Sequence, residues 1–198
     1  MFVRNYQKYK KTSSKIKELF IEELKSRPID QIRISEICEK LDINRTTFYR
    51  HYEDIYYLLK EIENDFINGL KSVYDDIAVN KEDSFEVMKD ILYFFKDNKD
   101  ICQILFTGQN SPSLWESYRK LSTDLFFKKI YQKYPQSLRI DGNELKQAVE
   151  FVSGGFLALY KNWVMDDCKE DIDILAKRLS SLSDSCIMKV LDLNNDRH

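Results

Sequence analysis

The densest run of side chains suited to binding another molecule lies at residues 44–51. It comprises an amide, two threonines, two arginines, a tyrosine and a histidine, with one serine upstream: Asn44, Arg45, Thr46, Thr47, Tyr49, Arg50, His51 and Ser35. Arginine can donate a fork of hydrogen bonds to guanine or phosphate, and threonine offers a hydroxyl to base edges and a methyl to thymine. These residue types predict contact with DNA, with residues 45–47 reading bases and residues 49–51 reaching flanking phosphates.

Two short helices that meet at a turn must hold these side chains. Their apolar anchors are Ile34, Ile37 and Leu41 before the turn, and Ile43, Phe48 and Tyr52 after it. The spacing of three and four residues places each set on one helical face. Asn44 stands where the second helix begins, so its side chain is expected to cap the free backbone N–H groups. The pattern predicts a helix-turn-helix over residues 33–52, whose second helix enters the major groove.

The run from Glu36 to Tyr52, Glu-Ile-x-x-x-Leu-x-Ile-Asn-Arg-Thr-Thr-Phe-Tyr-Arg-His-Tyr, resembles the signature of the TetR/AcrR family of transcriptional regulators. Together with Phe151-Val-Ser-Gly-Gly-Phe-x5-Asn-Trp163, it is most similar to the dihydroxyacetone-kinase-regulator-like branch. The resemblance implies an all-α fold with a three-helix DNA-binding head and a larger helical domain for ligand binding and dimerisation. It also implies a homodimer that binds a double-stranded, palindromic operator and answers to a small-molecule effector.

Four positions depart from the family pattern. Arg33, Leu41, Asp42 and Ile55 stand where threonine, a small residue, glycine and lysine are usual. Asp42 would have to adopt the left-handed conformation that glycine accepts freely, and Ile55 removes one expected phosphate contact. These departures keep an alternative open, namely a regulator of the same fold that acts mainly through a protein partner as a co-activator, without strong DNA binding.

Charge is distributed unevenly along the 198 residues, although the net charge is only −2. Residues 1–60 hold 13 basic and 9 acidic groups, whereas the remainder holds 18 basic and 24 acidic groups. Affinity for the phosphate backbone depends on local charge, so a basic head on an acidic body fits DNA binding. Residues 4–17 carry six basic groups and no acidic group, which suits an arm along DNA or a solvated tail.

Composition indicates a helical protein of the cytoplasm. Only five glycines and three prolines occur, and no signal peptide or bilayer-spanning apolar run is evident. The four cysteines, Cys38, Cys102, Cys168 and Cys186, form no Cys-x-x-Cys pair. We interpret them as small core residues, with a thiol sensor at Cys168 as the alternative.

The domain boundary is expected near residue 58, giving a DNA-binding domain at 1–58 and a regulatory and dimerisation domain at 59–198. A first helix should begin at Thr12 or Ser13 and end before Arg27-Pro28. A long helix capped by Asp54 should run to about Ile77, linking the two domains. Breaks are expected at 80–84, 97–99, 107–112 and 136–142.

The regulatory domain is rich in aromatic residues that are expected to line an apolar pocket. The candidates are Tyr93, Phe94, Phe106, Trp115, Tyr118, Phe126, Tyr160 and Trp163. Arg119, Lys161 and Asp124 are candidates for holding a polar end of the effector, whose identity the sequence does not give. Ordinary core packing of the same aromatic residues is the competing interpretation.

Two C-terminal helices carry apolar residues at alternating spacings of three and four, which is typical of packed helix pairs. We expect the dimer interface there, at Val149, Val152, Gly155, Phe156, Leu159, Leu175, Leu179 and Leu182. Packing within one protomer alone is the alternative. Gly154 and Gly155 reduce helix propensity, which makes sense if another helix approaches closely.

The sequence argues against an enzyme. It has two histidines, His51 and His198, no glycine-rich phosphate loop, and acidic pairs such as Asp75-Asp76 that are adjacent and do not share a helical face. We therefore expect no catalytic residue, no metal and no cofactor. The function that the sequence favours is a ligand-responsive, DNA-binding repressor.

Overall fold

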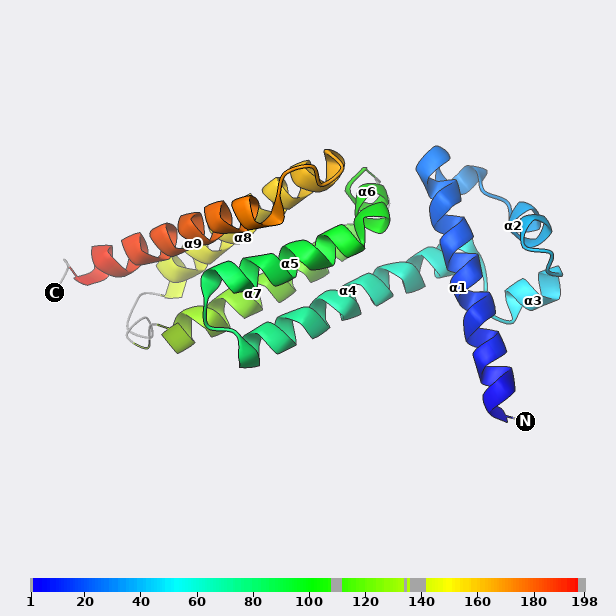
Figure 1. Cartoon of the computed structure of the whole chain (residues 1–198), viewed down its shortest axis with the longest axis horizontal. Coiled ribbons are helices and arrows are strands. Elements are labelled where there is room, and N and C mark those ends of the chain that lie inside the picture. The colour runs from blue at the N-terminus through cyan, green and yellow to red at the C-terminus, as the bar shows by residue number, and fades with distance from the viewer. Residues whose placement is uncertain (1, 108–111, 134, 136–141, 196–198) are drawn as a thin grey trace. The chain divides into compact units, whose positions relative to one another are not determined.

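The computed structural model describes residues 2–107, 112–133, 135 and 142–195, without the side chains of some residues near helix ends. All regular structure in these ranges is helical (Figure 1). The elements are α1 (Phe2–Ser26), the short 3-10 helix η1 (Ile29–Gln31), α2 (Ile34–Lys40), α3 (Arg45–Tyr49), α4 (Ile55–Asn80), α5 (Ser84–Asp97), α6 (Lys99–Thr107), α7 (Pro112–Lys133), α8 (Gly142–Met165) and α9 (Ile172–Asn195). The expected all-α class is confirmed.

The chain divides into two compact units, unit 1 (Met1–Phe66) and unit 2 (Ile67–His198). The division falls inside α4, eight residues beyond the boundary at residue 58 that the sequence suggested. Helix α4 is one unbroken helix of 26 residues, about 39 Å long, and therefore contributes residues to both units.

Helix α1 is longer than the sequence predicted. It begins at Phe2, whereas a start at Thr12 or Ser13 was expected. Thr12 lies within the helix and bonds back from Oγ1 to the carbonyl of Lys8 at 3.0 Å, which removes its role as a cap. The expected end before Arg27-Pro28 is confirmed, because α1 stops at Ser26. The basic N-terminal segment is thus part of a helix.

Unit 1 encloses a small apolar core. The side chains that are completely buried come from α1, α2, α3 and the start of α4: Ile16, Phe20, Ile37, Phe48 and Leu58. Tyr52 joins this core, and its hydroxyl lies 2.6 Å from Ser13 Oγ, which satisfies its polar end inside the unit. The core holds α1 behind the helix-turn-helix, as the apolar spacing predicted.

Helix ends in both units follow side-chain caps. Asp54 accepts a hydrogen bond from Tyr57 N at 2.7 Å, which confirms the expected cap of α4. Asp83 accepts from Phe85 N at 2.8 Å and starts α5. The break at 97–99 is confirmed by the end of α5 and the start of α6. The expected loop at 107–112 and the turn at 136–142 lie mostly outside the described residues.

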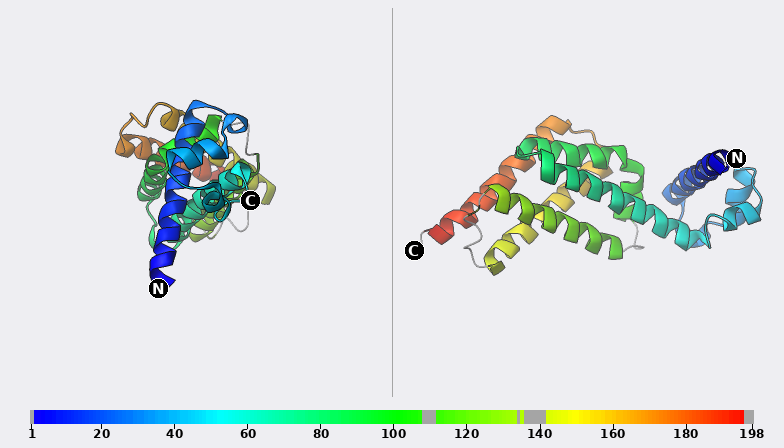
Figure 2. Two further views of the ribbon diagram at one scale, coloured as in Figure 1. Left: turned by 90° about the vertical axis from the view of Figure 1, so that its right-hand side faces the viewer. Right: turned by 90° about the horizontal axis from the view of Figure 1, so that it is seen from below.

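Unit 2 packs α5 against α9 and α8, and α8 against α6, α7 and α9 (Figures 1 and 2). Phe95 is at the centre of this packing, with ring centroids 5.0 Å from Tyr160, 6.1 Å from Tyr118 and 6.3 Å from Phe106. A second apolar cluster joins Ile130 of α7 to Leu145, Val149 and Ile187. Among the described residues, no helix is long and apolar enough to span a membrane.

Candidate DNA-binding site and effector pocket

The turn between α2 and α3 requires a backbone conformation that most residues avoid. Asp42 has φ +50°, in the left-handed region that aspartate tolerates better than most side chains. Ile43 N then bonds to Cys38 O at 3.0 Å and closes the turn. The turn conformation expected of Asp42 is confirmed, so the missing glycine leaves the helix-turn-helix intact.

Asn44 caps α3 as expected. Its Oδ1 accepts hydrogen bonds from Thr47 N at 2.7 Å and from Thr47 Oγ1 at 2.9 Å. The cap fixes where α3 begins, and therefore which residues form its first turn. It also engages the hydroxyl proton of Thr47, which leaves the oxygen lone pairs and the methyl group of that side chain for contact with another molecule.

The residues expected to contact DNA are exposed on one side of α3, with one exception. Arg45, Thr46, Tyr49 and Arg50 are exposed, and Thr47 is half-buried. Tyr49 leaves 54% of its surface open, although Phe48 beside it is completely buried. Ser35, at the start of α2, is half-buried. The short helix thus separates a buried anchor from polar side chains that are free to bind.

His51 is the exception, because its side chain is buried in this structure. It is only 9% exposed, its ring stacks on Tyr9 at 3.9 Å between centroids, and both ring nitrogens are buried without a hydrogen-bond partner. Burial, with a smaller contribution from the charge of Arg50, lowers the pKa of His51. In this structure His51 packs α1 against the end of α3, and its contact with a phosphate stays a prediction.

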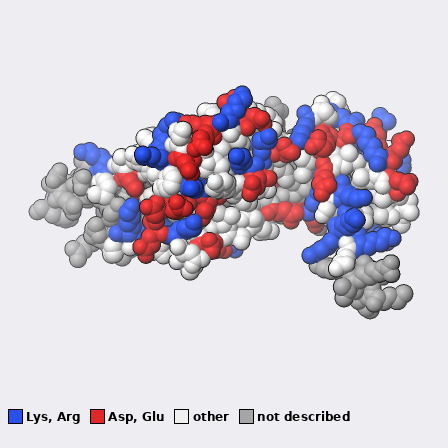
Figure 3. Space-filling view, viewed as in Figure 1, with Lys and Arg blue, Asp and Glu red and all other residues white. Residues whose placement is uncertain are grey.

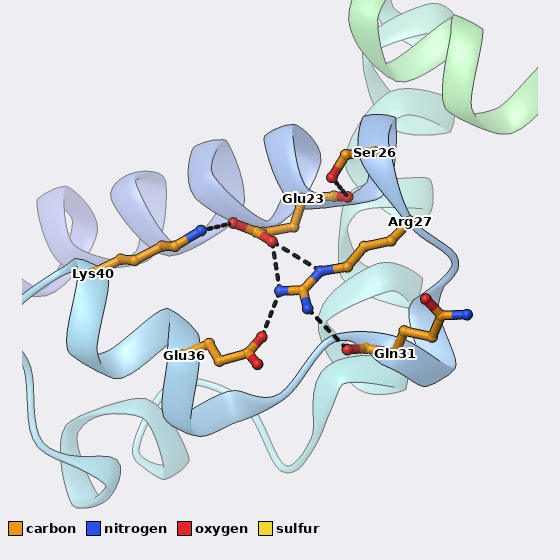
Figure 4. Close-up of polar contacts among 6 residues, drawn as sticks. All are labelled: Glu23, Ser26, Arg27, Gln31, Glu36 and Lys40. Atoms are coloured by element: carbon orange, nitrogen blue, oxygen red, sulfur yellow. Dashed lines mark hydrogen bonds and ion pairs between the residues drawn. The ribbon is translucent and has the colours of Figure 1, made fainter.

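A network of four charged residues, Glu23, Arg27, Glu36 and Lys40, fixes α2 on α1 (Figure 4). The Glu23 carboxylate accepts from Arg27 Nη2 at 2.6 Å and from Lys40 Nζ. Arg27 also donates to Glu36 and, at 3.1 Å, to the Gln31 carbonyl. The network ties both ends of α2 to the last turn of α1, so it sets the position from which α3 projects.

Hydrogen bonds from Lys40 and Arg27 lower the pKa of Glu23, although its burial opposes the shift. The pKa of Glu36 is lowered mainly by its hydrogen bond from Arg27. This network was not predicted from the sequence. Its signal was two acid–base pairs at helical i,i+4 spacing, Glu23 with Arg27 and Glu36 with Lys40.

The N-terminal half of α1 presents a basic surface. Lys8, Lys10, Lys11 and Lys15 are exposed, and Figure 3 shows Lys and Arg atoms gathered there. A regular helix spaces these charges along one rod, which a flexible tail would not do. The surface can therefore follow a phosphate backbone without ordering a disordered segment.

Unit 2 contains a pocket of about 680 Å³ among α4, α5, α7, α8 and α9. Its interior is formed by apolar and tyrosine side chains, and its polar rim is formed by Lys81, Glu82, Ser84, Lys129, Gln132, Lys133, Ser183 and Asp184. A pocket of this volume matches the range that encloses drug-sized molecules. The hydroxyl of Tyr74, in the pocket lining, shares a hydrogen bond of 3.0 Å with Ser122 Oγ. Burial raises the pKa of Tyr74 to about 12.

The structure brings three of the eight expected pocket residues to the pocket: Tyr118, Phe126 and Tyr160. Tyr93 is largely exposed, Phe94 packs against Gly69, and Phe106 stacks on Phe95. Trp163 donates from Nε1 to the Glu170 carbonyl at 2.9 Å and anchors the connection from α8 to α9. The side chain of Trp115 lies outside the described residues. The other four thus serve the surface or core, because aromatic content does not reveal which side of a helix faces the pocket.

The expected polar residues are also misplaced, since Arg119, Lys161 and Asp124 do not line the pocket. Arg119 pairs with Glu116 at 2.8 Å. Lys129 was missed, although the sequence carried a signal for it. Tyr118, Ser122, Phe126 and Lys129 follow one another at spacings of four, four and three, so a lysine occupies the inward-facing side of α7.

The expected dimer residues fall into two groups. Five of them are buried inside the protomer and are not available to a partner: Val149, Val152, Phe156, Leu175 and Leu179. For these five residues the expectation is corrected. Gly155, Leu159 and Leu182 are exposed. The alternating spacing of three and four residues therefore marks mainly the stripe by which α8 and α9 pack on their own unit.

A second apolar stripe remains exposed on each of these helices. On α8 it comprises Phe151, Gly154, Gly155, Ala158, Leu159 and Met165, and on α9 Ile174, Leu182 and Met188. Phe151 and Ile174 leave 75% and 58% of their surfaces open. A Cβ placed on Gly154 or Gly155 would meet nothing within 4 Å, so packing inside the protomer does not require either glycine.

The cysteines are free thiols. Cys38 and Cys102 are buried, which confirms them as core residues, and Cys168 and Cys186 are half-buried. Burial raises the pKa of Cys168, and that opposes thiolate formation. In the described ranges, no group of His, Cys, Asp or Glu side chains is arranged to hold a metal ion.

Comparison with known proteins adds the family. The TetR-type family model described as "Transcriptional regulator C-terminal region" matches residues 82–185. An HTH-type transcriptional regulator of Staphylococcus aureus is 26% identical over 137 residues, covering 67% of this chain and 70% of the relative. The HTH-type transcriptional regulator YxbF of Bacillus subtilis is 33% identical over 63 residues, which is 31% of this chain and 17% of the relative.

Among solved structures, the dihydroxyacetone kinase operon activator DhaS has a TM-score of 0.59, with 18% identity, over 89% of this chain and 96% of its own. That likeness concerns the fold, which has an N-terminal helix-turn-helix and a larger helical C-terminal unit. The matched proteins are regulators and not enzymes. Because the family model spans more than half of the sequence, the chain belongs to the TetR family of transcriptional regulators.

Proposed function

We propose that this protein is a homodimeric repressor that binds a palindromic operator and changes its DNA affinity when a small molecule enters the pocket of unit 2. The observation that supports DNA binding is the construction of α3. Its anchor Phe48 is buried and its start is fixed by Asn44, so Arg45, Thr46 and Tyr49 project outward from a defined frame. Such a frame reads bases with its first turn and holds phosphates with its later residues.

Dimerisation is supported by the exposed stripes of α8 and α9. One reading helix contacts few base pairs, and two heads that meet successive major grooves about 34–36 Å apart would double the contact. Apolar surface left open on adjacent helices is stabilised by burial against a second copy. Gly154 and Gly155 fit this role, because they allow close approach of a partner helix that the protomer itself does not supply.

Control by a ligand is supported by α4, which belongs to both units and lines the pocket through Tyr74, Ala78 and Val79. A ligand that favours one position of α4 can change the separation of the two heads. It acts only through a difference in its affinity for the DNA-competent and incompetent states. Repression follows if the dimer covers a promoter. DhaS is named an activator, and transcription from a selected promoter distinguishes repression from activation in this protein.

The first test is selection of bound fragments from the source genome, followed by anisotropy titrations on selected and scrambled duplexes. We expect tight binding to selected sites, steep weakening with salt, and a stoichiometry of one dimer per site. Transcription from a selected promoter should fall when the protein is added. Absence of sequence preference would contradict this proposal and favour a regulator that works through a protein partner.

A further inference from the structure

The rim of the pocket in unit 2 carries a partly buried cation, Lys129, that forms no ion pair with an acidic side chain of the described residues. Lys129 of α7 donates to the backbone carbonyl of Lys81, and no carboxylate of the described residues lies within 4 Å of its ammonium group. Its neighbours on the rim differ in this respect. Lys81 pairs with Asp90 at 3.1 Å, and Lys133 pairs with Asp184 at 3.3 Å. Lys129 is therefore the rim cation best placed to receive an anionic group from outside the chain.

Glu82 is the acidic residue that acts on Lys129 from a longer distance. It is exposed and already hydrated, whereas Lys129 is partly withdrawn from water, and this burial lowers the pKa of Lys129. A desolvated cation gains more from a direct anionic partner than a hydrated carboxylate gains from a cationic one. The rim thus favours an anion.

The interior of the pocket favours an apolar body. Met88 and Ile91 of α5, Phe126 of α7 and Phe156 of α8 line it, with Phe126 and Phe156 in ring contact at 5.6 Å. The buried Tyr160 hydroxyl has a thioether, Met88 Sδ at 3.5 Å, as its hydrogen-bond partner. Sulfur is a weak acceptor, so this hydroxyl remains able to donate to an oxygen of a ligand.

The length of the pocket follows from the register of α4 and α7, which run in the same direction (Figure 1). Tyr74 meets Ser122 at the inner end, and Lys81 meets Lys129 at the rim, seven residues further along each segment. Seven helical residues rise about 10 Å. A molecule that touches Lys129 and reaches the tyrosine hydroxyls must therefore be elongated.

We propose that this pocket binds an elongated amphipathic carboxylate, with the carboxylate on Lys129 and the apolar body between Phe126, Phe156 and the side chains of α5. The inference rests on the proposed function for its regulatory meaning, because binding matters to the cell only if it alters operator affinity. A fatty acid and an arylalkanoic acid share this chemistry. The pocket separates such molecules from neutral alcohols and cationic amphiphiles of the same length.

Calorimetric titration of the full chain with decanoate, decanol and decyltrimethylammonium, all below micelle formation, tests the proposal. A carboxylate on a desolvated lysine should bind about tenfold or more tightly than the alcohol, because a charge-assisted hydrogen bond is lost in the latter. A phenylalkanoate arm shows whether linear or aromatic bodies fit better. Equal affinity for decanoate and decanol, or preference for the cationic amphiphile, would overturn the proposal.

Lys129→Met should reduce decanoate affinity to the level of decanol, and Lys129→Arg should retain most of it. Lys128→Met is the matched control, since Lys128 is the adjacent, exposed lysine of the same helix. Retained decanoate selectivity in Lys129→Met, or its loss in Lys128→Met, would place the anion elsewhere and contradict the proposal. Circular dichroism and ligand-free operator binding should match the wild type in all three variants.

Operator titrations with and without decanoate distinguish a failure of the proposed function from a failure of the ligand inference. If the ligand-free protein binds no selected DNA, the proposed function fails, while calorimetry still decides the ligand class. If DNA binding is intact and decanoate does not bind, the ligand inference fails alone. Binding of decanoate without any change in operator affinity would overturn its role as an effector class.

Discussion

The helix pairs α2/α3 and α8/α9 each bury one apolar face, but they differ in the chemical character of the face that stays exposed. In α2/α3 one face is apolar and buried, and the opposite face is polar, with Arg45, Thr46 and Tyr49 exposed. In α8/α9 one apolar stripe is buried in the unit, and a second stripe that includes Phe151 and Ile174 remains exposed. A polar outer face suits a charged, hydrogen-bonding partner such as DNA, and an apolar outer face suits another protein surface.

The difference also lies in what holds each pair. Helix α2 is tied to α1 by the Glu23 network, so charged hydrogen bonds fix its position in unit 1. Helix α8 is held by apolar packing around Val149 and Leu145, and its outer face takes no part in that packing. We therefore expect substitutions on the outer face of α8 to affect assembly without affecting folding. Substitutions behind α2 should affect folding and DNA binding together.

Charge on the outer face of α8 should give the largest effect. Phe151→Glu is expected to yield a folded monomer, because the side chain is exposed in the protomer, and to weaken operator binding on the order of a hundredfold or more through loss of bivalency. Gly155→Leu should act in the same direction. Analytical ultracentrifugation and anisotropy titration measure both effects.

Lys146→Ala is the control for these two variants, because Lys146 is an exposed residue of the same helix that lies outside the apolar stripe. It should remain dimeric and bind the operator normally. A Phe151→Glu protein that is still a dimer would show that the exposed stripes do not form the interface.

Removal of one charge from the Glu23 network should give the next effect. Glu23→Gln leaves Arg27 and Lys40 without their shared carboxylate and should lower the free energy of unfolding by about 2–3 kcal/mol. Glu22→Gln, at the exposed neighbouring residue paired with Lys25, should change it by about 0.5 kcal/mol or less. Urea unfolding followed by circular dichroism measures the free energy of unfolding of both variants. Equal decreases in the two variants would show that the network does not stabilise the fold.

The sequence predicted unit 1 better than unit 2 for a physical reason. In unit 1 the turn at Asp42, the cap by Asn44 and the anchor Phe48 are local features, each decided by residues close in sequence. The packing of His51 against Tyr9 depends on an α1 that starts earlier than its apolar spacing indicated, so it was missed. The helix-turn-helix was thus predictable, apart from the one contact that a distant element decides.

In unit 2 the predicted residues had the right character but partly the wrong side. The buried stripe with Val149 and Leu179 and the exposed stripe with Phe151 and Leu182 are both apolar, and spacing alone does not tell which one faces a neighbouring helix. The same ambiguity separated Tyr118, which lines the pocket, from Tyr93, which is exposed. These choices are made by packing between helices far apart in sequence.

The polar face of α3 should divide into base and phosphate contacts. Arg45→Ala and Thr46→Ala are expected to reduce discrimination between selected and mismatched operators by about 1–3 kcal/mol. Tyr49→Phe keeps the ring and removes a phosphate hydrogen bond, so all duplexes should lose about 0.5–1.5 kcal/mol. Arg178→Ala, in unit 2, is the control for removal of an arginine. Uniform losses on every duplex for all three α3 variants would contradict the division of roles.

The smallest effect should be a dependence of unit 1 stability on pH that comes from His51. Its folded-state pKa is lowered by burial, so the neutral ring stabilises the fold above the unfolded pKa near 6.5. As the pH falls below that value, His51 is protonated in the unfolded chain but stays neutral in the folded chain. The free energy of unfolding should therefore decrease. One group can contribute at most about 1.4 kcal/mol per pH unit. The charged Arg50 and the ring of Tyr9 lie beside it. The carboxylates of Glu23 and Glu36 have lowered pKa values and stay ionised between pH 5 and 7.5. His51→Phe keeps the stacking on Tyr9 and should flatten the profile, whereas an unchanged slope in this variant would assign the pH dependence to other groups.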